Sequence, residues 1–153
     1  MATNGINTIE MGNNVKVLVG TSTNPTDELE HINSVGDITD EATIVDVQVY
    51  GEQYLQKLIG SKNAGPIDII VNFNPDALAA PVQKTMRDAY TNNTPLYFRI
   101  QMLNATGDAG DEVTFTGRVG SASISQEFDA VRTQNFNIAI DGAVSTPSAI
   151  DFA

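Results

Sequence analysis

Apolar and polar residues alternate with a period of two along most of this chain, and this period is typical of β-strands whose two faces meet different surroundings. The segment from Leu96 to Met102 is the clearest case, because every second side chain in it is apolar. Strands are expected at residues 14–19, 42–50, 67–73, 96–102, from 113 onward and at about 131–141. The pattern predicts a mainly β protein, a β-sandwich or barrel, in which one face of each strand packs into a core.

Three of these strands are expected to carry an acidic residue on the face that points away from the core. In the strand at 42–50, the β-branched face is expected to pack inward, which places Asp46 on the opposite face. The same alternation turns Asp68 away from the core in the strand at 67–73, and Asp141 outward at the end of the last strand.

The strand expected from residue 113 contains a run of small residues between Gly117 and Ser123. Glycine inside a strand weakens regular pairing and often marks a bulge. We therefore expect a long strand that bends or bulges at Gly117 or Gly120.

One flanking helix is expected, at about 75–91, where the apolar residues change to helical spacing. The residues of this apolar stripe are Leu78, Val82, Met86 and Ala89. Asn74 can cap the helix and Pro75 suits its first position. Pro81 conflicts with this start, because a proline inside a helix removes a hydrogen bond and costs about 3 kcal/mol. Either the helix begins near Ala80, with Pro81 in its first turn, or it kinks at Pro81.

Two irregular segments interrupt the strand pattern. Residues 20–41 are rich in small polar residues and are expected to form a long exposed connection. Residues 51–65 are compatible with either a helical turn or the tip of an extended hairpin. The apolar residues of this second segment form either a small cluster under a loop or a contact patch for another subunit. They are Tyr54, Leu55, Leu58 and Ile59.

The chain of 153 residues is strongly acidic, with 19 Asp and Glu against 8 Lys and Arg and a net charge of -11. Residues 21–52 contain eight of these acids and no Lys or Arg. Such a charge repels nucleic acids and anionic membranes instead of binding them. No apolar run approaches the roughly 20 residues that span a bilayer. We expect one domain at 14–142, preceded by an N-terminal arm at 1–13 and followed by a C-terminal tail at 143–153, with both ends mobile.

Candidate catalytic and metal-binding residues are few. His31 is the only imidazole, and the chain has no cysteine to complete a site around it. The turn from Gly107 to Glu112 offers carboxylate oxygens for calcium but lacks the EF-hand spacing. Asp111 and Glu112 would be general acid and base candidates for a hydrolase, but adjacent residues on a strand point to opposite faces. We therefore expect neither an enzyme nor a bound metal or cofactor.

The order of the expected elements resembles the tail tube, or major tail, proteins of bacteriophages with long, non-contractile tails. The resemblance covers most of the chain, including the acidic strand at 42–50, the extended connection to 67–73 and the helix after it. The segments most similar to the family are Phe115–Ile124 and Asn135–Gly142.

This resemblance implies a tail-tube fold, a β-sandwich or barrel flanked by a helix, and a structural role in the virion. The subunits would assemble as hexameric rings that stack into a hollow tube, through which double-stranded DNA leaves the capsid without specific binding. The implied partners are other copies of the chain and the tape-measure, tail-tip and tail-terminator proteins, with no membrane. The protein would be made in the host cytoplasm and reside in the virion tail.

In such a tube, a ring repeats each acid six times at one height, so that belts of charge would repel DNA along its path. The candidates for lining the lumen are the strand acids Asp46, Asp68 and Asp141, any of which could instead lie on the outer surface. The candidates for contacts between subunits or rings are Asp27, Glu28, Glu30, Asp37, Asp40 and Glu41, together with Tyr54, Leu55, Leu58 and Ile59.

Two other functions remain open on the sequence. A tube subunit of a contractile tail or of a related secretion tube would show the same pattern of elements. A carbohydrate-binding or adhesive β-sandwich would need an aromatic-lined groove, whereas the chain has no tryptophan and only 7% aromatic residues.

Overall fold

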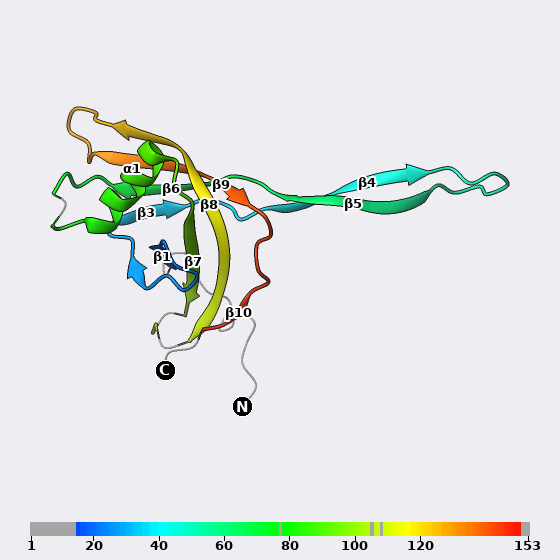
Figure 1. Ribbon diagram of the computed structural model, residues 1–153, viewed down its shortest axis with the longest axis horizontal. Helices are drawn as coiled ribbons and strands as arrows, with labels where there is room; N and C mark the ends of the chain where they lie inside the picture. Colours follow the sequence, from blue (N-terminus) through cyan, green and yellow to red (C-terminus); the bar gives the residue numbers. More distant parts are fainter. Residues whose placement is uncertain (1–14, 77, 105, 108, 151–153) are drawn as a thin grey trace.

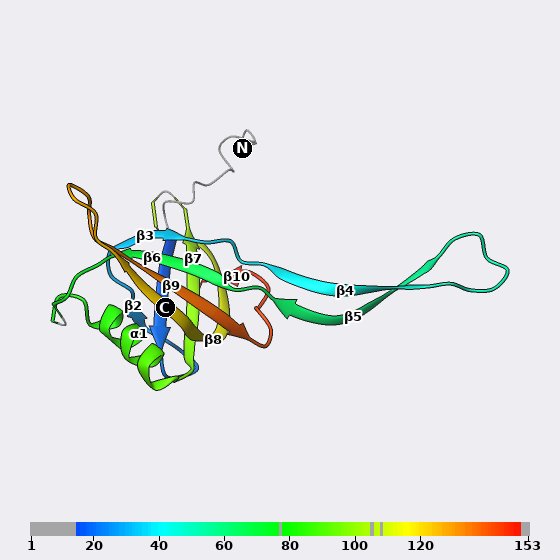
Figure 2. The ribbon, with the colours of Figure 1, turned by 90° about the horizontal axis from the view of Figure 1, so that it is seen from above.

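The computed structural model describes residues 15–76, 78–104, 106–107 and 109–150. It consists of a β domain with one helix and a two-stranded arm that projects far from this domain (Figures 1 and 2). The expected N-terminal arm at 1–13 and the last three residues of the expected C-terminal tail lie outside the described residues.

The strands and the helix follow one another in the order β1 (Val15–Gly20), β2 (Asp27–Glu28), β3 (Ile32–Val35), β4 (Asp40–Val47), β5 (Gln56–Ala64), β6 (Ile67–Asn72), α1 (Pro81–Asn92), β7 (Leu96–Leu103), β8 (Gly110–Ser125), β9 (Thr133–Asp141) and β10 (Ser148–Ala149). One antiparallel sheet has the strand order β2-β1-β7-β8-β9-β6-β3, with β10 paired to β8. The strands β4 and β5 form a separate sheet of their own. The mainly β fold with a single helix agrees with the sequence prediction.

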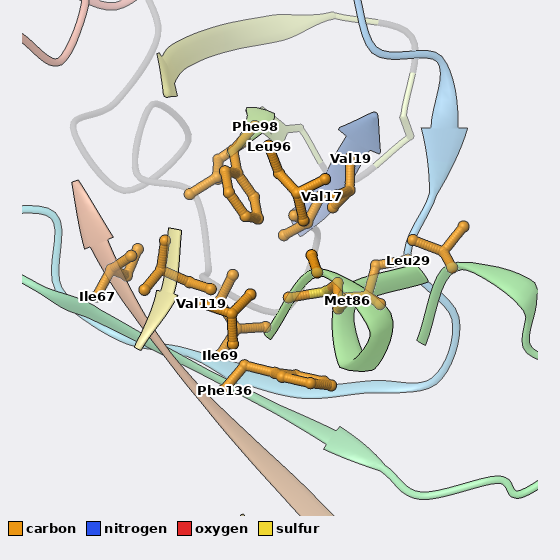
Figure 3. Packing of buried hydrophobic residues seen from close by; sticks show 14 of the residues in the cluster. Val17, Val19, Leu29, Ile67, Ile69, Met86, Leu96, Phe98, Val119 and Phe136 are labelled. Atoms are coloured by element: carbon orange, nitrogen blue, oxygen red, sulfur yellow. The ribbon is translucent and has the colours of Figure 1, made fainter. Parts of the chain in front are cut away.

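The hydrophobic core lies between the curved main sheet and α1. Alternate residues of β6 show the expected periodicity, because Ile67, Ile69 and Val71 are buried while Asp68 is exposed. Met86 of α1 points into the cluster that side chains of the sheet form (Figure 3). Since every strand of the main sheet longer than four residues contributes a buried face, the core couples the helix to the whole sheet.

The long strand and its bulge follow the sequence prediction. β8 has 16 residues, and its register against β9 shifts between Val119 and Ser121, which places the bulge at Gly120. At Gly117 the neighbouring strand approaches closely. A Cβ there would lie 2.8 Å from Cγ2 of Ile138 and 2.9 Å from the carbonyl oxygen of Ala139, so this position has no room for a side chain.

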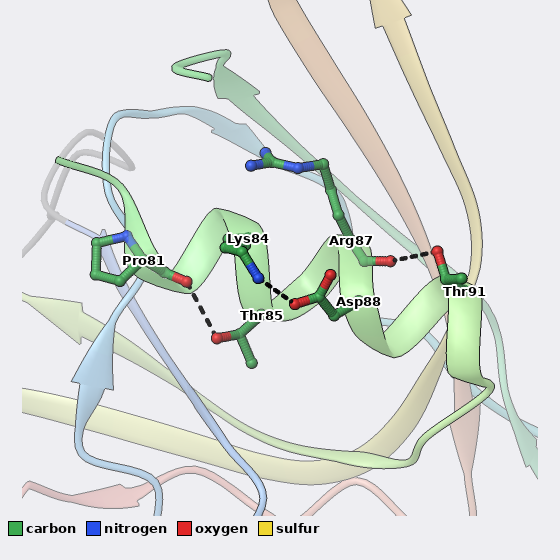
Figure 4. Close-up of polar contacts among 6 residues, drawn as sticks. All are labelled: Pro81, Lys84, Thr85, Arg87, Asp88 and Thr91. Carbon is green, nitrogen blue, oxygen red and sulfur yellow. Dashed lines mark hydrogen bonds and ion pairs between the residues drawn. The ribbon is translucent and has the colours of Figure 1, made fainter. Parts of the chain in front are cut away.

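The helix begins later than the expected start at residue 75. Pro81 occupies its first turn, as in one of the two alternatives that the sequence left open. Before it, the Asn74 and Asp76 side chains accept hydrogen bonds from the backbone N–H groups two residues later, which holds the segment in turns. Leu78, expected on the apolar stripe, is 94% exposed in this non-helical segment. Figure 4 shows the polar contacts along the helix, including the Lys84–Asp88 ion pair.

The N-terminus of α1 is capped by a residue that is distant in sequence. The two carboxylate oxygens of Glu30 accept hydrogen bonds from the backbone N–H groups of Val82 and Gln83, at 3.2 and 3.4 Å. A carboxylate at this end of a helix also interacts favourably with the helix dipole. The Ala80 cap position makes no side-chain hydrogen bond, so Glu30 supplies the missing acceptor.

The Gln83 side chain ties the helix to the sheet. It is fully buried, and its Nε2 donates to the carbonyl oxygens of Glu30 and Asn72, at 3.0 and 3.1 Å. Its Oε1 accepts a hydrogen bond from the backbone N–H of Asn74 at 3.2 Å. One side chain therefore satisfies three backbone groups around the start of the helix.

The connection at 20–41 is not one exposed loop, as expected, because it contributes two short strands to the main sheet. β2 pairs with β1, and β3 pairs with β6 at one end of the sheet. Leu29, between them, is 2% exposed and belongs to the core. Strands of two and four residues are too short to show an alternating pattern, which explains why the sequence did not reveal them.

Part of the C-terminal tail is paired, in contrast to the loose tail expected from the sequence. β10 pairs with Asp111 and Glu112 at the start of β8. Before it, Ser145 exchanges two hydrogen bonds with the backbone of Thr114, accepting one at its hydroxyl oxygen and donating one from its own N–H. These bonds extend the edge of β8 where β9 ends.

Replacing Gln83 with leucine is expected to destabilise the domain by about 2 kcal/mol, because three partly buried backbone groups lose their partner. Urea unfolding of the unassembled protein measures this change. The control is Lys84→Ala, which removes an exposed ion pair and should cost at most about 0.5 kcal/mol. Equal effects of the two substitutions would contradict a structural role for the Gln83 hydrogen bonds.

Candidate subunit interface

The β4–β5 arm is the most unusual part of the molecule. Its two strands are joined by residues 48–55 and extend away from the main sheet, as both Figure 1 and Figure 2 show. The segment at 51–65, which the sequence left open between a helical turn and a hairpin tip, is therefore the tip and second strand of a hairpin. Its register includes Asp40 opposite Ala64 at the base and Val47 opposite Gln56 near the tip.

The arm buries almost none of its own residues. Ala64, at its base, is the only buried residue of the two strands. The prediction that the β-branched face of β4 packs into the core is wrong, because the strand leaves the domain before either face can pack. The large exposed apolar side chains of the two strands, with the exposed fraction of each, are Ile44 (60%) and Val45 (45%) on β4 and Leu58 (58%) and Ile59 (64%) on β5.

Such an arm lacks the features that make a hairpin stable on its own. An isolated two-stranded hairpin in water is at best marginally stable, and large exposed apolar surfaces usually mark interaction sites. The cross-strand ion pair between Lys57 Nζ and Asp46 Oδ1, at 2.7 Å, is exposed and contributes only about 0–1 kcal/mol. The arm therefore has the composition of a segment that another molecule covers.

The four apolar residues predicted in the segment at 51–65 lie in the arm, Tyr54 and Leu55 at its tip and Leu58 and Ile59 on β5. Their exposed fractions are 85% for Tyr54, 52% for Leu55, 58% for Leu58 and 64% for Ile59. The alternative interpretation, a satellite cluster packed under a loop, is wrong because these side chains are exposed. Their role as a contact patch between subunits stays a prediction.

The predicted acidic contact residues are spread over three places. Asp27 and Glu28 form β2 and are exposed at one edge of the main sheet. Asp40 and Glu41 are exposed at the base of the arm, and Asp37 lies in the segment that leads into it. Glu30 differs from the others, because its carboxylate caps α1. It has an intramolecular structural role whether or not it contacts another subunit.

The three predicted lumen acids do not lie together. Asp46 is on the arm, where it pairs with Lys57. Asp68 is on β6, exposed, and accepts a hydrogen bond at 2.7 Å from Nδ2 of Asn137, its cross-strand neighbour on β9. Asp141 follows Asn137 by four residues on β9, so it shares that face about 13 Å further along the strand. Asp68 and Asp141 thus mark one sheet face, away from α1.

An apolar groove opens at the end of the domain from which the arm leaves. It has a volume of about 580 Å³ and lies between β3, the segment after it and the ends of β1 and β7. Its apolar lining residues are Val15, Ile32, Val35, Ile38, Ile100 and Met102. The groove contains no aromatic side chain, so it does not resemble the aromatic-lined groove that a carbohydrate-binding module would need.

The acids considered for hydrolysis have structural partners. Glu112 lies 3.6 Å from Nε of Arg99 and accepts a hydrogen bond from Gln101. Asp111, on the opposite face of β8, sits where β10 pairs. Within the part of the chain that the structure describes, no group of three or more His, Cys, Asp or Glu side chains could hold a metal ion. No helix in this part is long and apolar enough to cross a membrane.

Sequence reasoning missed Ile44 and Val45 as interface candidates. Both lie in a strand whose alternation is equally compatible with packing on the protein's own core. The neighbouring segment at 51–65 carried a signal for an interface, because its apolar residues had no expected position in the core.

Comparisons with known proteins bear on the fold. No family model and no curated protein matches the chain. Among solved structures, it is similar to the tail of an empty gene transfer agent particle with C6 symmetry, with a TM-score of 0.64 and 18% identity over 94% of this chain and 98% of the other. It is also similar to the SPP1 tail tube, with a TM-score of 0.65 and 15% identity over 92% of this chain and 78% of the other.

A third similar structure is the sheath–tube complex of an extracellular contractile injection system called PVC, in its extended state. The TM-score is 0.67 and the identity 16%, over 98% of this chain and 99% of the other. At these identities the likeness establishes the fold alone. The tail-tube-like fold expected from the sequence is confirmed.

Proposed function

We propose that this protein is the structural subunit of a tail tube, which forms six-membered rings that stack into a hollow conduit for DNA. The observation that carries the proposal is the arm, because it exposes apolar side chains along both strands on a domain with the tail-tube fold. One similar structure is a tail with C6 symmetry, which supports six as the number of subunits in a ring.

The arm gives a physical reason for assembly. A cyclic ring needs a heterologous interface, in which one surface of a subunit meets a different surface of its neighbour. The arm projects from one end of the domain and supplies the first surface. Covering it removes apolar area from water at about 25 cal/mol per Å². Assembly is therefore favoured by the segment that is least stable in the isolated chain.

The charge of the chain suits a conduit that DNA passes without binding. With a net charge of -11, each subunit adds negative charge to a ring. Two unit charges about 10 Å apart in water interact by only about 0.4 kcal/mol, so a single acid has little effect and repetition by symmetry is needed. Asp68 and Asp141 are the stronger lumen candidates because they share one sheet face. Asp46 is weaker, because Lys57 neutralises it.

In this function the protein is not an enzyme, and its location is the tail of a virion or virion-like particle assembled in the host cytoplasm. Its partners are other copies of itself and the tape-measure, tail-tip and tail-terminator proteins that complete a tail. Double-stranded DNA is a transient occupant of the conduit. No cofactor takes part.

A tube inside a contractile sheath is the second candidate function. It is favoured by the similarity to a contractile sheath–tube complex over 98% of this chain. The two candidates share the ring, the conduit and the arm, and differ only in whether a sheath binds the outside of the tube.

Removing the arm is expected to abolish ring formation while the domain still folds. Residues 41–63 are replaced by Asn-Gly, because Asp40 and Ala64 already pair across the base of the arm and a two-residue turn can join them. Negative-stain electron microscopy of the purified protein should show rings and tubes for the natural chain only. Unfolding of both proteins by urea is the control for folding. Rings formed by the shortened chain would contradict the role of the arm.

Reversing the charge of Asp68 and Asp141 to lysine should make tubes retain short double-stranded DNA in a DNase-protected form. The retention should disappear at high salt, since salt of about 1 M screens charges beyond about 3 Å. The control is Asp88→Lys, on the exposed side of α1, where bound DNA would remain sensitive to DNase. If no protected DNA is recovered from tubes of the double variant, these two acids do not face the conduit.

A further inference from the structure

The turn between β8 and β9 presents a large apolar side chain to solvent. Phe128 is 95% exposed, and the nearby Ile124 and Val131 are 45% and 69% exposed. We call these three side chains the β8–β9 tip. Large apolar side chains that gather on an exposed turn usually mark an interaction site. The tip is separate from the arm, because it lies on the opposite side of the main sheet (Figure 1).

A hydrogen bond holds the turn itself in shape. The backbone N–H of Ala130 donates to the carbonyl oxygen of Glu127 at 3.3 Å, which makes Phe128 and Asp129 the two central residues of a β-turn. Asp129 has a φ of 61°, in the left-handed region that Asp tolerates better than most residues. The turn therefore keeps the Phe128 side chain pointing away from the chain's own core.

The base of the same hairpin is tied to α1. Gln134 of β9 is 1% exposed, and its Oε1 accepts a hydrogen bond from Nη1 of Arg87 at 3.2 Å. The guanidinium of Arg87 also lies over the ring of Phe73, 5.2 Å from the ring centroid. These contacts hold the hairpin against the domain, so that the tip is in position before it meets a partner, which lowers the cost of binding.

The apolar groove opens at the opposite end of the same strand. Met102, in the wall of the groove, pairs with Asp111 at the start of β8, whereas the tip surrounds the end of β8 at Ser125. The two features are about 45 Å apart along the strand, at about 3.3 Å per residue. Two copies of the chain placed end to end in the same orientation can thus bring the tip of one to the groove of the other. A heterologous contact of this kind repeats along a stack.

The groove suits an aromatic side chain. Its volume of about 580 Å³ falls within the range of about 300–1,000 Å³ that encloses a small ligand, and its lining is aliphatic without an aromatic ring. Met102 is 37% exposed and offers a thioether sulfur, which makes favourable contacts with aromatic rings. Four other lining residues pack against the core but are only partly buried, so the core is open to solvent here. They are Val15, Ile32, Val35 and Ile38.

The polar groups beside the two surfaces are complementary. Arg132 is exposed next to the tip and Asp37 lines the groove, and neither forms an ion pair with any residue that the structure describes. The acids on either side of Phe128 would meet side chains that can donate hydrogen bonds, because Asn33 and Ser34 also line the groove. A second acidic copy of the chain can therefore approach the groove with its tip, in spite of the net charge of both.

We propose that the β8–β9 tip of each subunit inserts Phe128 into the apolar groove of another copy of the chain. The inference rests on the proposed function, because stacked rings set copies of the chain end to end. Each subunit then uses its tip toward one neighbouring ring and its groove toward the other. Phe128 is the anchor of this contact, and the groove buries a ring that the isolated chain leaves in water.

Chemical cross-linking tests the contact with Phe128 left in place, because the natural chain has no cysteine. Val131→Cys and Met102→Cys are made in separate batches of the protein, and the two are mixed before assembly. A short bismaleimide should then link the two variants into dimers in tubes, but not in unassembled protein. Neither variant alone should give dimers. The control mixture of Asp88→Cys, on the exposed side of α1, with Met102→Cys should stay monomeric.

Removing the ring gives a second measurement. Phe128→Ser should raise the protein concentration needed for rings to stack by at least about tenfold, because the anchor of the contact is lost. Its unfolding by urea should match that of the natural chain, since the ring packs against nothing in its own domain. The matched control is Tyr90→Ser, which removes a 48% exposed aromatic ring from α1 and should leave stacking unchanged.

The outcomes separate this inference from the proposed function. Tubes of the mixed cysteine variants without cross-linked dimers would overturn the inference, even if Phe128→Ser impairs stacking, because Phe128 would then contact another surface. Stacking of Phe128→Ser at the natural concentration would overturn it as well. In both cases the tubes themselves would uphold the proposed function. If the natural protein forms neither rings nor tubes, even when seeded with tail tips, the proposed function fails and this contact fails with it.

Discussion

The pairing of β8 on both of its edges is the constraint on which the rest of the domain depends. One edge binds β7 along its first half, and the other edge binds β10 and then β9. The bulge at Gly120 and the missing side chain at Gly117 let this single strand of 16 residues curve while its neighbours stay paired. The curved sheet then encloses the core against α1, and both sheet edges and the arm take their positions from it.

The arm differs from β8, because its two strands pair only with each other and pack against no other part of the domain. Its two strands pair with each other along their inner edges, but its apolar side chains are not buried. In a monomer this exposes area that favours association, whereas in the proposed assembly of stacked rings the same area would be covered. Under the proposed function, the stability of this protein is divided between folding and assembly, as expected of a subunit that acts as a polymer.

Sequence periodicity predicted the parts of the fold whose strands are long and half-buried. β6, β7 and β9 appear within two residues of their expected positions, because alternate residues such as Phe98 and Phe136 have no place except the core. The helix was predicted to begin at residue 75, because Asn74 and Pro75 are typical of a helix start. It begins at Pro81 instead, because Asx turns hold the segment before it. β2 and β3 were not predicted, because their own residues show no strand pattern. They are strands because they pair with β1 and β6. Glu30 was taken for a surface contact, and its capping of a helix 52 residues away is visible only in the fold.

The sequence by itself determined the class of protein: a β-rich, acidic, cysteine-free chain without catalytic motifs, with one helix and the order of elements of a tail tube. The β-rich class, the helix and the charge follow from local periodicity and composition, whereas the tail-tube order of elements is a resemblance to a known family. Only the tertiary structure decided where each face of a strand points. The alternation in β4 is the same as in a core strand, yet the strand leaves the domain and both of its faces meet solvent. Periodicity shows that a strand has distinct faces, but what covers each face depends on contacts between distant segments and between copies of the chain.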